Sequence, residues 1–200
     1  MKLIGMLDSP YVRRTAISLD LYGVAFEHQA LSVFSTFEAF AAINPVVKAP
    51  SLVLDDGTVL MDSTVIIGYF EAQAAEGRKQ LPHHPAALGK ALEVVGLALA
   101  ACEKAVQIVY ERNLRPEEKR HLPWVDRVTR QLLAACDALD KHYANAAGHS
   151  LDQAAIGSAV AWSFIQLMVA DVVKAADFPA LQAHAARLEE TELFKRYPMV

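Results

Sequence analysis

The feature that most constrains the fold of this chain is a change of hydrophobic pattern at Leu81-Pro-His-His-Pro85. Before this segment, short apolar runs alternate with helix-like patterns, whereas from Ala86 onward only helical periodicity is found. Proline cannot continue a helix and restricts the residue before it, so the two prolines separate the two patterns. The sequence therefore predicts two domains, residues 1–80 and 86–200, joined by a linker over residues 81–85.

The first domain is predicted to begin with a strand, a helix and a second strand. Residues 2–7 and 24–31 are short runs of the kind found in strands. Between them, Ser9-Pro10 is typical of a helix start, because serine is a favoured N-cap and proline is tolerated at the first helical position. Gly23 stands where this helix is expected to end.

A helix, a hairpin and a further helix are expected next. Ser35-Thr-Phe-Glu38 has the spacing of a capping box and predicts a helix that ends before Pro45. Asp56-Gly57 between two apolar runs predicts a β-hairpin, and Asp62-Ser63 is expected to start a helix with Ser63 as its N-cap. The resulting order, βαβαββα, predicts an α/β domain of the thioredoxin-like class.

The second domain is predicted to be an all-α helical bundle. Its helical segments are expected at residues 86–112, 123–146, 150–174 and 179–190. Ser150-Leu-Asp-Gln153 has capping-box spacing and opens the third segment. No charge lies between Asp152 and Asp171, a length close to the ~18 residues of a membrane span, but polar residues interrupt this segment. A buried central helix is therefore predicted, without a membrane span.

Composition and charge exclude several classes of function. With 19 Lys and Arg against 23 Asp and Glu, the net charge of −4 argues against a nucleic-acid or anionic-membrane surface. The apolar run after Lys2 is shorter than the ~7 residues of a signal peptide, and Cys102 and Cys136 suit reduced thiols, so a cytoplasmic protein is expected. The adjacent His83-His84 is most simply a solvated linker, and no metal is expected.

Ser9 is the first candidate for chemistry. A hydroxyl in the first turn of a helix lies at the positive end of the helix dipole, where a thiolate ligand gains ~0.3–1 kcal/mol and accepts a hydrogen bond. The alternative is that Ser9 only caps its helix. The local sequence leaves both interpretations open.

Two further candidates are Lys48-Ala49-Pro50 and Asp62-Ser63. A cis peptide before Pro50 would turn the Ala49 backbone outward to pair with a ligand in the manner of a strand, with an ordinary trans proline as the alternative. The helix start at Ser63 leaves backbone N–H groups for a ligand carboxylate, and Asp62 is suited to an ammonium group. The alternative for this pair is plain capping.

Taken together, these segments resemble glutathione transferases. The resemblance is carried by the helix start Ser9-Pro10-x-x-Arg13, the loop Asn44-Pro45-x-x-Lys48-Ala49-Pro50 and the pair Asp62-Ser63, in this order. It covers essentially the whole chain, including the linker and the capped central helix. It implies the glutathione transferase fold, in which a thioredoxin-like glutathione-binding domain is followed by an all-α domain that forms the electrophile pocket.

The resemblance implies a role for each matching residue. Ser9 takes the place of the residue that hydrogen-bonds the glutathione sulfur. Lys48 corresponds to a position directed at the glycyl end, and Ala49 to the residue whose backbone pairs with the cysteinyl unit beside a cis-proline, here Pro50. Asp62-Ser63 corresponds to the pair that holds the γ-glutamyl group.

The match also has departures. Asp62 is one methylene shorter than the common Glu, Val47 replaces a frequent Gly, and Gln153 stands where the capping box usually carries Asp. The electrophile pocket is matched only by position, with the candidates Leu7, Tyr11, Val106, Gln107 and Tyr110.

The resemblance implies a detoxification enzyme that conjugates the glutathione thiolate to a small hydrophobic electrophile, with glutathione as co-substrate. One alternative is a glutathione-binding, ligand-carrier or interaction protein of the same fold with little turnover. Another is a glutathione-dependent thiol or peroxide reductase, which would favour Cys at the position of Ser9. A homodimer is also implied, and the hydrophobic content of 54% agrees with one.

Overall fold

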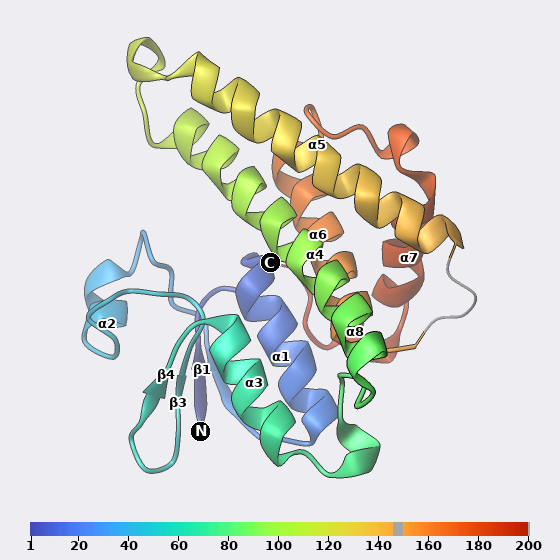
Figure 1. The fold of residues 1–200 in the computed structure, drawn as a ribbon. Coiled ribbons are helices and arrows are strands. Elements are labelled where there is room, and N and C mark those ends of the chain that lie inside the picture. Colours follow the sequence, from blue (N-terminus) through green and yellow to red (C-terminus); the bar gives the residue numbers. More distant parts are fainter. Residues whose placement is uncertain (146–149, 200) are drawn as a thin grey trace. The chain divides into compact units, whose positions relative to one another are not determined.

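The computed structural model describes residues 1–145 and 150–199 and divides into two compact units. The first unit consists of Met1–Leu81 together with Thr191–Val200, and the second of Pro82–Glu190 (Figure 1). The sequence pattern assigns residues 191–200 to the helical domain, whereas in the structure this segment packs with the first unit. The predicted helix break at Gly148-His149 lies outside the described residues.

The first unit is built on a four-stranded mixed sheet with the strand order β2-β1-β3-β4. β1 pairs in parallel with β2 and antiparallel with β3, and β3 pairs antiparallel with β4. The predicted order βαβαββα is confirmed. The elements are β1 (Lys2–Ile4), α1 (Pro10–Tyr22), β2 (Glu27–Gln29), α2 (Phe37–Ala41), β3 (Ser51–Val53), β4 (Val59–Leu60) and α3 (Ser63–Gln73).

β1 ends earlier than predicted because of Gly5. This residue has a φ of +137°, a conformation that side chains rarely adopt, so the extended run stops after Ile4. A Cβ at Gly5 would lie 2.5 Å from Cγ2 of Val12 and 3.3 Å from Cβ of Ala49. The end of β1, the first turn of α1 and the loop before β3 therefore meet at Gly5.

The helix starts agree with the predictions only in part. α1 has Ser9 as its N-cap and Gly23 as its C-cap with a φ of +76°, as predicted. The capping box at Ser35–Glu38 is wrong, because α2 begins only at the third residue of that motif and its N-cap Thr36 makes no side-chain capping bond. The Thr36 hydroxyl instead accepts a hydrogen bond from the Ser32 N–H at 2.8 Å.

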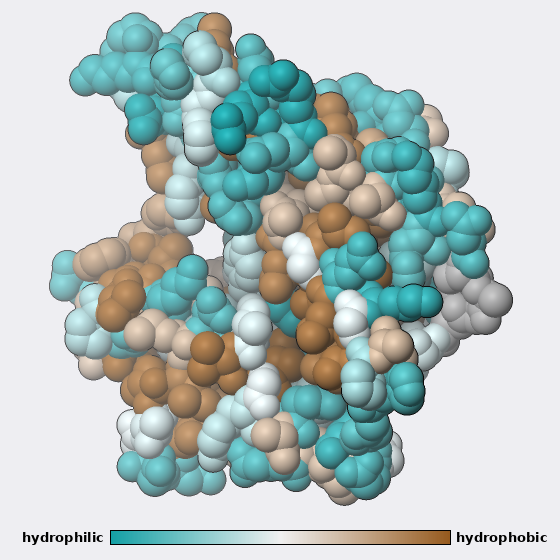
Figure 2. Space-filling model, viewed as in Figure 1, coloured by the Kyte–Doolittle hydropathy of each residue, from teal (hydrophilic) through white to brown (hydrophobic). Residues whose placement is uncertain are grey.

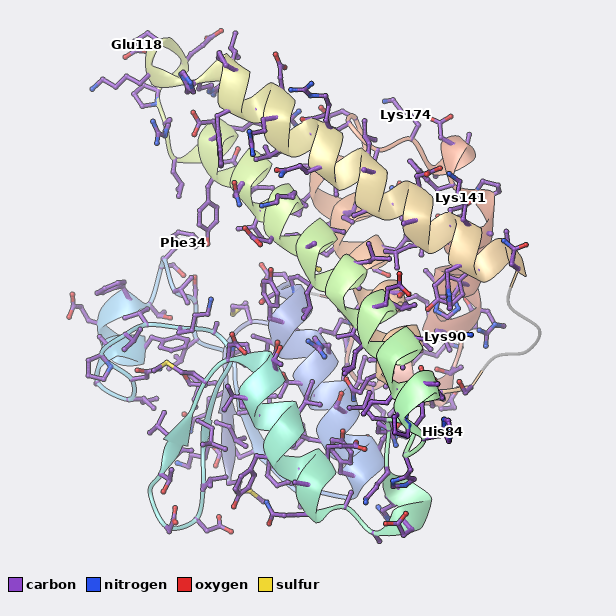
Figure 3. All side chains as sticks on the ribbon, viewed as in Figure 1. Phe34, His84, Lys90, Glu118, Lys141 and Lys174 are labelled. Carbon is purple, nitrogen blue, oxygen red and sulfur yellow. The ribbon has the colours of Figure 1, made fainter. Side chains whose placement is uncertain are left out.

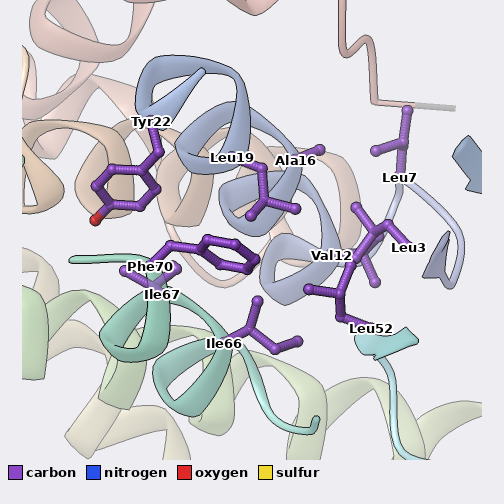
Figure 4. Packing of buried hydrophobic residues seen from close by; sticks show 10 residues of the cluster. All are labelled: Leu3, Leu7, Val12, Ala16, Leu19, Tyr22, Leu52, Ile66, Ile67 and Phe70. Carbon is purple, nitrogen blue, oxygen red and sulfur yellow. The ribbon is translucent and has the colours of Figure 1, made fainter. Parts of the chain in front are cut away.

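The core of the first unit lies between α1, α3 and the sheet (Figure 4). The apolar residues of α1 recur with helical spacing and so share the face that is buried. The main contributors are Val12, Ala16 and Leu19 from α1, Ile66, Ile67 and Phe70 from α3, and Leu3 and Leu52 from the strands. This packing fixes the first turn of α1, where Ser9 lies.

The tail from Thr191 onward contains α8 (Glu192–Lys195) and contacts α1 at two points. Near the start of α1, the buried Arg13 donates from Nε to the carbonyl of Tyr197 at 2.7 Å, and its guanidinium lies 5.4 Å from the Phe194 ring centroid. Near its end, Oδ2 of Asp20 accepts hydrogen bonds from Arg196 Nε (2.9 Å) and the Tyr197 hydroxyl (3.0 Å). No pattern in the sequence predicts this contact.

The second unit is helical, as predicted. It contains α4 (Pro85–Asn113), α5 (Leu122–Asn145), α6 (Gln153–Val169) and α7 (Pro179–Glu189). α6 is buried along almost its whole length, which agrees with its lack of charge. Within residues 1–145 and 150–199, no helix combines the length and the apolarity that crossing a bilayer requires.

The cap of α6 differs from the predicted capping box. Asp152 is the N-cap, and its Oδ1 accepts a hydrogen bond from the Ala155 N–H at 2.9 Å. The hydroxyl of Ser150 donates to Oδ2 of the same carboxylate at 2.6 Å. Ser150 therefore orients the cap rather than forming it.

Several large apolar side chains of the first unit are exposed. Figure 2 shows apolar surface over α3 and around α2. On α3 the exposed residues are Val65 and Tyr69; near α2 they are Phe34, Phe37 and Val46. Figure 3 shows Phe34 projecting from the segment before α2, and its exposed fraction is 57%. These side chains leave an apolar surface that the first unit does not bury.

Candidate functional site

Ser9 both caps α1 and keeps a hydrogen for another partner. Its backbone is extended (φ −70°, ψ 121°), which brings Oγ to 3.5 Å from the Val12 N–H that it accepts. This bond is longer than the usual 2.7–3.2 Å or so of an N–H···O bond, so the cap is a weak one. A hydroxyl can accept and donate at once, and no acceptor for the Ser9 hydrogen is found in the described ranges.

Ala49 lies in the loop between α2 and β3, against the end of β1. The Ala49–Pro50 peptide is cis, in agreement with the resemblance. Ala49 is half-buried, and within residues 1–145 and 150–199 no protein group accepts a hydrogen bond from its N–H. The neighbouring Lys48 side chain is exposed, and nothing in the same ranges holds its ammonium group.

The N-terminus of α3 is capped by Asp62, so the prediction that Ser63 is the N-cap is wrong. The extended backbone of Asp62 (φ −90°, ψ −161°) places Oδ1 2.9 Å from the Thr64 N–H, which donates to it. Ser63 becomes the first helical residue and is 1% exposed. Its Oγ faces Nη1 of the buried Arg14 on α1 at 3.5 Å.

The structure therefore brings together the three segments that the sequence singles out. Gly5 joins the loop at Ala49 to the first turn of α1, and Arg14 joins α1 to the start of α3. Ser9, Lys48, Ala49, Pro50, Asp62 and Ser63 all belong to the first unit. The arrangement comprises a hydroxyl donor, an unpaired backbone N–H and a capped helix N-terminus, three groups that can each hydrogen-bond a polar ligand.

The residues predicted for the electrophile pocket are divided between the two units. Leu7 and Tyr11 belong to the first, where Leu7 packs in the hydrophobic core and Tyr11 is half-buried. Val106, Gln107 and Tyr110 lie on α4 in the second, and of these Tyr110 is exposed. Their role stays a prediction.

A separate pocket of about 390 Å³ lies at the end of α4 and the start of α5 in the second unit. It is lined by Glu111, Arg115, His121 and Trp124, none of which the sequence singles out. The buried Glu111 carboxylate accepts a hydrogen bond from the His121 N–H at 2.6 Å and pairs with Arg115 Nε at 3.0 Å. Both of its oxygens are therefore used to hold the connection between the two helices.

The cysteines are poorly placed for thiol chemistry. Cys102 and Cys136 are both buried, and both lie in the second unit. Burial raises the pKa of the Cys136 thiol to about 12, because the thiolate would lose its hydration there. A thiolate at neutral pH is therefore disfavoured at Cys136.

Two buried polar residues that the sequence does not mark as functional support the loop that carries Lys48 and Ala49. Asn44 is 4% exposed and Ser51 is 0% exposed, and the side chains are joined by a hydrogen bond of 2.8 Å. The Asn-Pro motif marks Asn44 only as part of a loop, and Ser51 reads as the first residue of a strand. A buried hydrogen bond between them could not be inferred from spacing alone.

The comparisons with known proteins agree with this architecture. Residues 3–78 match the sequence model of the glutathione S-transferase N-terminal domain. The uncharacterised GST-like protein YibF of Escherichia coli K12 is 37% identical over 71 residues, a match that covers 36% of this chain and 35% of YibF. The chain thus spans about a third of the length of this curated relative.

Solved structures match over nearly the whole chain. A glutathione transferase family member from Pseudomonas fluorescens Pf-5, with bound S-(propanoic acid)-glutathione, is 29% identical, with a TM-score of 0.82 and 98% of both chains covered. A glutathione S-transferase from Methylobacterium radiotolerans, in complex with glutathione sulfonate, has a TM-score of 0.90 at 23% identity, covering 98% of this chain and 93% of that one. The predicted fold class, a thioredoxin-like domain followed by a helical one, is confirmed, and so is the predicted resemblance to glutathione S-transferases, whose N-terminal domain model matches residues 3–78.

Proposed function

We propose that this protein binds glutathione in its first unit and adds the glutathione thiolate to a small hydrophobic electrophile. The single observation that carries the proposal is the convergence of Ser9, Ala49 and the Asp62-capped start of α3 around the N-terminal half of α1. The bound glutathione derivatives of the two structurally similar proteins support the same ligand class.

Each part of the tripeptide has a counterpart in this arrangement. The thiol meets the Ser9 hydroxyl, and the cysteinyl backbone pairs with Ala49 in the manner of a strand. The γ-glutamyl carboxylate meets Ser63 at the N-terminus of α3, and its ammonium group meets the Asp62 oxygen that does not cap the helix. The ammonium group of the exposed Lys48 side chain pairs with the glycyl carboxylate.

The chemical contribution of the protein is to stabilise the thiolate. A free thiol has a pKa of ~8.5, and lowering it by two units requires ~2.7 kcal/mol. One hydrogen bond to a charged group supplies ~1.5–3 kcal/mol, and a helix dipole adds ~0.3–1 kcal/mol. Ser9 at the N-terminus of α1 provides both, so the thiolate fraction at neutral pH rises more than tenfold.

The helical domain, residues 86–200 in the predicted division, is proposed to supply the acceptor side of the reaction. The candidate residues on α4 are Val106, Gln107 and Tyr110. A cytoplasmic homodimer acting in detoxification completes the proposal. Thiol or peroxide reduction is disfavoured, because Ser stands at position 9 and both cysteines are buried in the second unit.

Calorimetry with glutathione and a turnover assay with an aromatic halide test the proposal together. Binding with conjugation supports it. Binding without turnover, across several types of electrophile, would instead favour a glutathione-binding carrier protein. Absence of glutathione binding would contradict both functions.

A further inference from the structure

The loop that carries Lys48 and Ala49 is organised from behind by the side chain of Asn44. The side-chain oxygen Oδ1 of Asn44 accepts a hydrogen bond from the Val46 N–H at 3.1 Å, and the backbone carbonyl of Asn44 accepts one from the Val47 N–H at 2.9 Å. Nδ2 donates to Ser51 Oγ at 2.8 Å and faces Met61 Sδ at 3.2 Å. The buried amide of Asn44 therefore has a partner for each of its polar atoms.

Ser51 passes this contact on to the loop backbone. Its fully buried hydroxyl donates to the carbonyl oxygen of Lys48 at 2.7 Å. The direction is fixed, because a side-chain amide N–H can only donate and a hydroxyl has one hydrogen. Asn44, Ser51 and the Lys48 carbonyl form a chain of two hydrogen bonds, which we name the Asn44–Ser51 relay.

The relay sets the orientation of the peptide plane between Lys48 and Ala49. This peptide bond is trans, so its C=O and N–H point in opposite directions. With the Lys48 carbonyl turned inward to Ser51, the Ala49 N–H must point away from the relay. Ala49 is half-buried, and its N–H is unpaired within the described residues, so it is available as a donor to a ligand.

The backbone next to this peptide is strained. Val47 has a φ of +51°, which places a β-branched residue in the left-handed region. For such a residue this conformation costs ~1–2 kcal/mol, and it persists only where the surroundings hold it. The two hydrogen bonds that Asn44 accepts from the Val46 and Val47 N–H groups, together with the relay, hold Val47 in this conformation.

We infer that Ser51 is a positioning residue for glutathione binding, acting through the Lys48–Ala49 peptide without touching the ligand. The inference rests on the proposed function. By fixing the peptide plane before the ligand arrives, the relay presents the Ala49 N–H to the cysteinyl carbonyl in advance. The ligand then gains this hydrogen bond without first having to order the loop.

The test compares Ser51→Ala with Ser18→Ala as a matched control. Ser18 is in the same unit, is also 0% exposed, and its hydroxyl also donates to a backbone carbonyl, that of Arg14, at 2.6 Å. For each protein, the thermal midpoint, the Kd for glutathione by calorimetry and the hydrogen exchange of the Ala49 amide by NMR are measured. Ser51→Ala is expected to weaken Kd about tenfold, which corresponds to one backbone hydrogen bond to the ligand.

In wild type, glutathione should protect the Ala49 amide from exchange, and in Ser51→Ala this protection should fall in step with the affinity. Ser18→Ala should lower the thermal midpoint with no change in Kd. A folded Ser51→Ala protein with wild-type Kd and wild-type Ala49 protection would overturn the inference while leaving the proposed function intact. Failure of the wild-type protein to bind glutathione would overturn the proposed function itself.

Asn44→Asp provides a second variant for the case in which Ser51→Ala does not fold. A carboxylate cannot donate to Ser51, so the Ser51 hydroxyl would turn to the carboxylate and release the Lys48 carbonyl. No atom of Ser51 is removed, yet the same loss of Ala49 protection and of glutathione affinity is expected. Unchanged values for both would count against the relay.

Discussion

At the scale of single residues, Ser9 combines a helix cap with the proposed thiol donor, and one substitution separates the two. Ser9→Ala should raise the pKa of bound glutathione, read from the ultraviolet absorbance of the thiolate. Turnover at neutral pH should fall roughly ten- to a hundredfold, the equivalent of ~1.4–2.7 kcal/mol. Glutathione affinity should change much less, because Lys48, Ala49 and Asp62-Ser63 hold the rest of the tripeptide.

The unfolding free energy of Ser9→Ala provides the control for this variant. Loss of an N-cap costs ~1 kcal/mol, and the long 3.5 Å bond to the Val12 N–H places Ser9 at or below that value. A helix cap alone would lower the unfolding free energy and leave the bound thiol unchanged. If the thiol of bound glutathione has the same pKa in wild type and in Ser9→Ala, the activating group lies elsewhere, and Tyr11 is the next residue to test.

At the scale of elements, the start of α3 separates capping from ligand binding. Asp62→Asn keeps the cap, because Asn is as good an N-cap as Asp, so the unfolding free energy should change by less than about 1 kcal/mol. The neutral amide no longer attracts the γ-glutamyl ammonium, and Kd for glutathione should rise about tenfold, or ~1.4 kcal/mol. Calorimetry and urea unfolding measure the two effects separately.

Asp62→Ala serves as the matched variant for this experiment. It removes the cap as well as the charge and should lose both stability and affinity. An Asp62→Asn protein that binds glutathione as tightly as wild type would show that Asp62 only caps α3.

Elements whose ends are set by local residues could be predicted from the sequence. α1 runs between Ser9 and Gly23, and the hairpin turns at Asp56-Gly57, because caps and tight turns depend on neighbouring residues. α2 is present as predicted, but its start and its capping box are wrong because Thr36 bonds to Ser32, a local competitor that the capping-box spacing does not reveal.

The site residues divide in the same way. Ser9, Ala49 and Asp62-Ser63 stand in recognisable motifs, so the sequence could single them out. The hydrogen bond between Asn44 and Ser51 could not be predicted, since the partner of a buried polar side chain is fixed by tertiary packing. The same holds for Arg13, whose partner in the tail is 184 residues away.

At the scale of the whole molecule, the tail makes the stability of the first unit depend on pH. Burial and the hydrogen bond to Asp20 raise the pKa of Tyr197 from 10.0 to about 12. Between these values the unfolded chain loses a proton that the folded protein keeps, so the unfolding free energy should fall as pH rises through this range. Below the lower value the contribution is fully present.

Urea unfolding at pH 9 and pH 11 measures this effect, with Tyr197→Phe as the comparison. Burial also raises the pKa of Tyr143 in the second unit to about 12, so the wild-type protein should lose stability at more than one place. The variant keeps the Tyr143 contribution and should show a smaller loss between the two pH values. Equal losses in the two proteins would exclude Tyr197 as a source.

The homodimer is a second prediction at this scale. The family resemblance implies it, and the exposed apolar residues Val65 and Tyr69 on α3 provide surface that association could cover. Light scattering at micromolar concentration should give about twice the mass of one chain. Tyr69→Asp should shift the protein toward the monomer, and a wild-type mass of a single chain would remove the prediction.

The tail also bears on how the protein is made. Phe194, Arg196 and Tyr197 of the tail complete the packing of α1, yet the second unit, Pro82–Glu190, is translated between them and the rest of the first unit. At elongation rates of ~5–20 residues per second, the ribosome needs roughly 5–20 s to translate that interval. During this time the nascent chain presents α1 with Arg13 and Asp20 still lacking their tail contacts. The first unit can therefore reach its final packing only after the whole second unit and the tail have been translated.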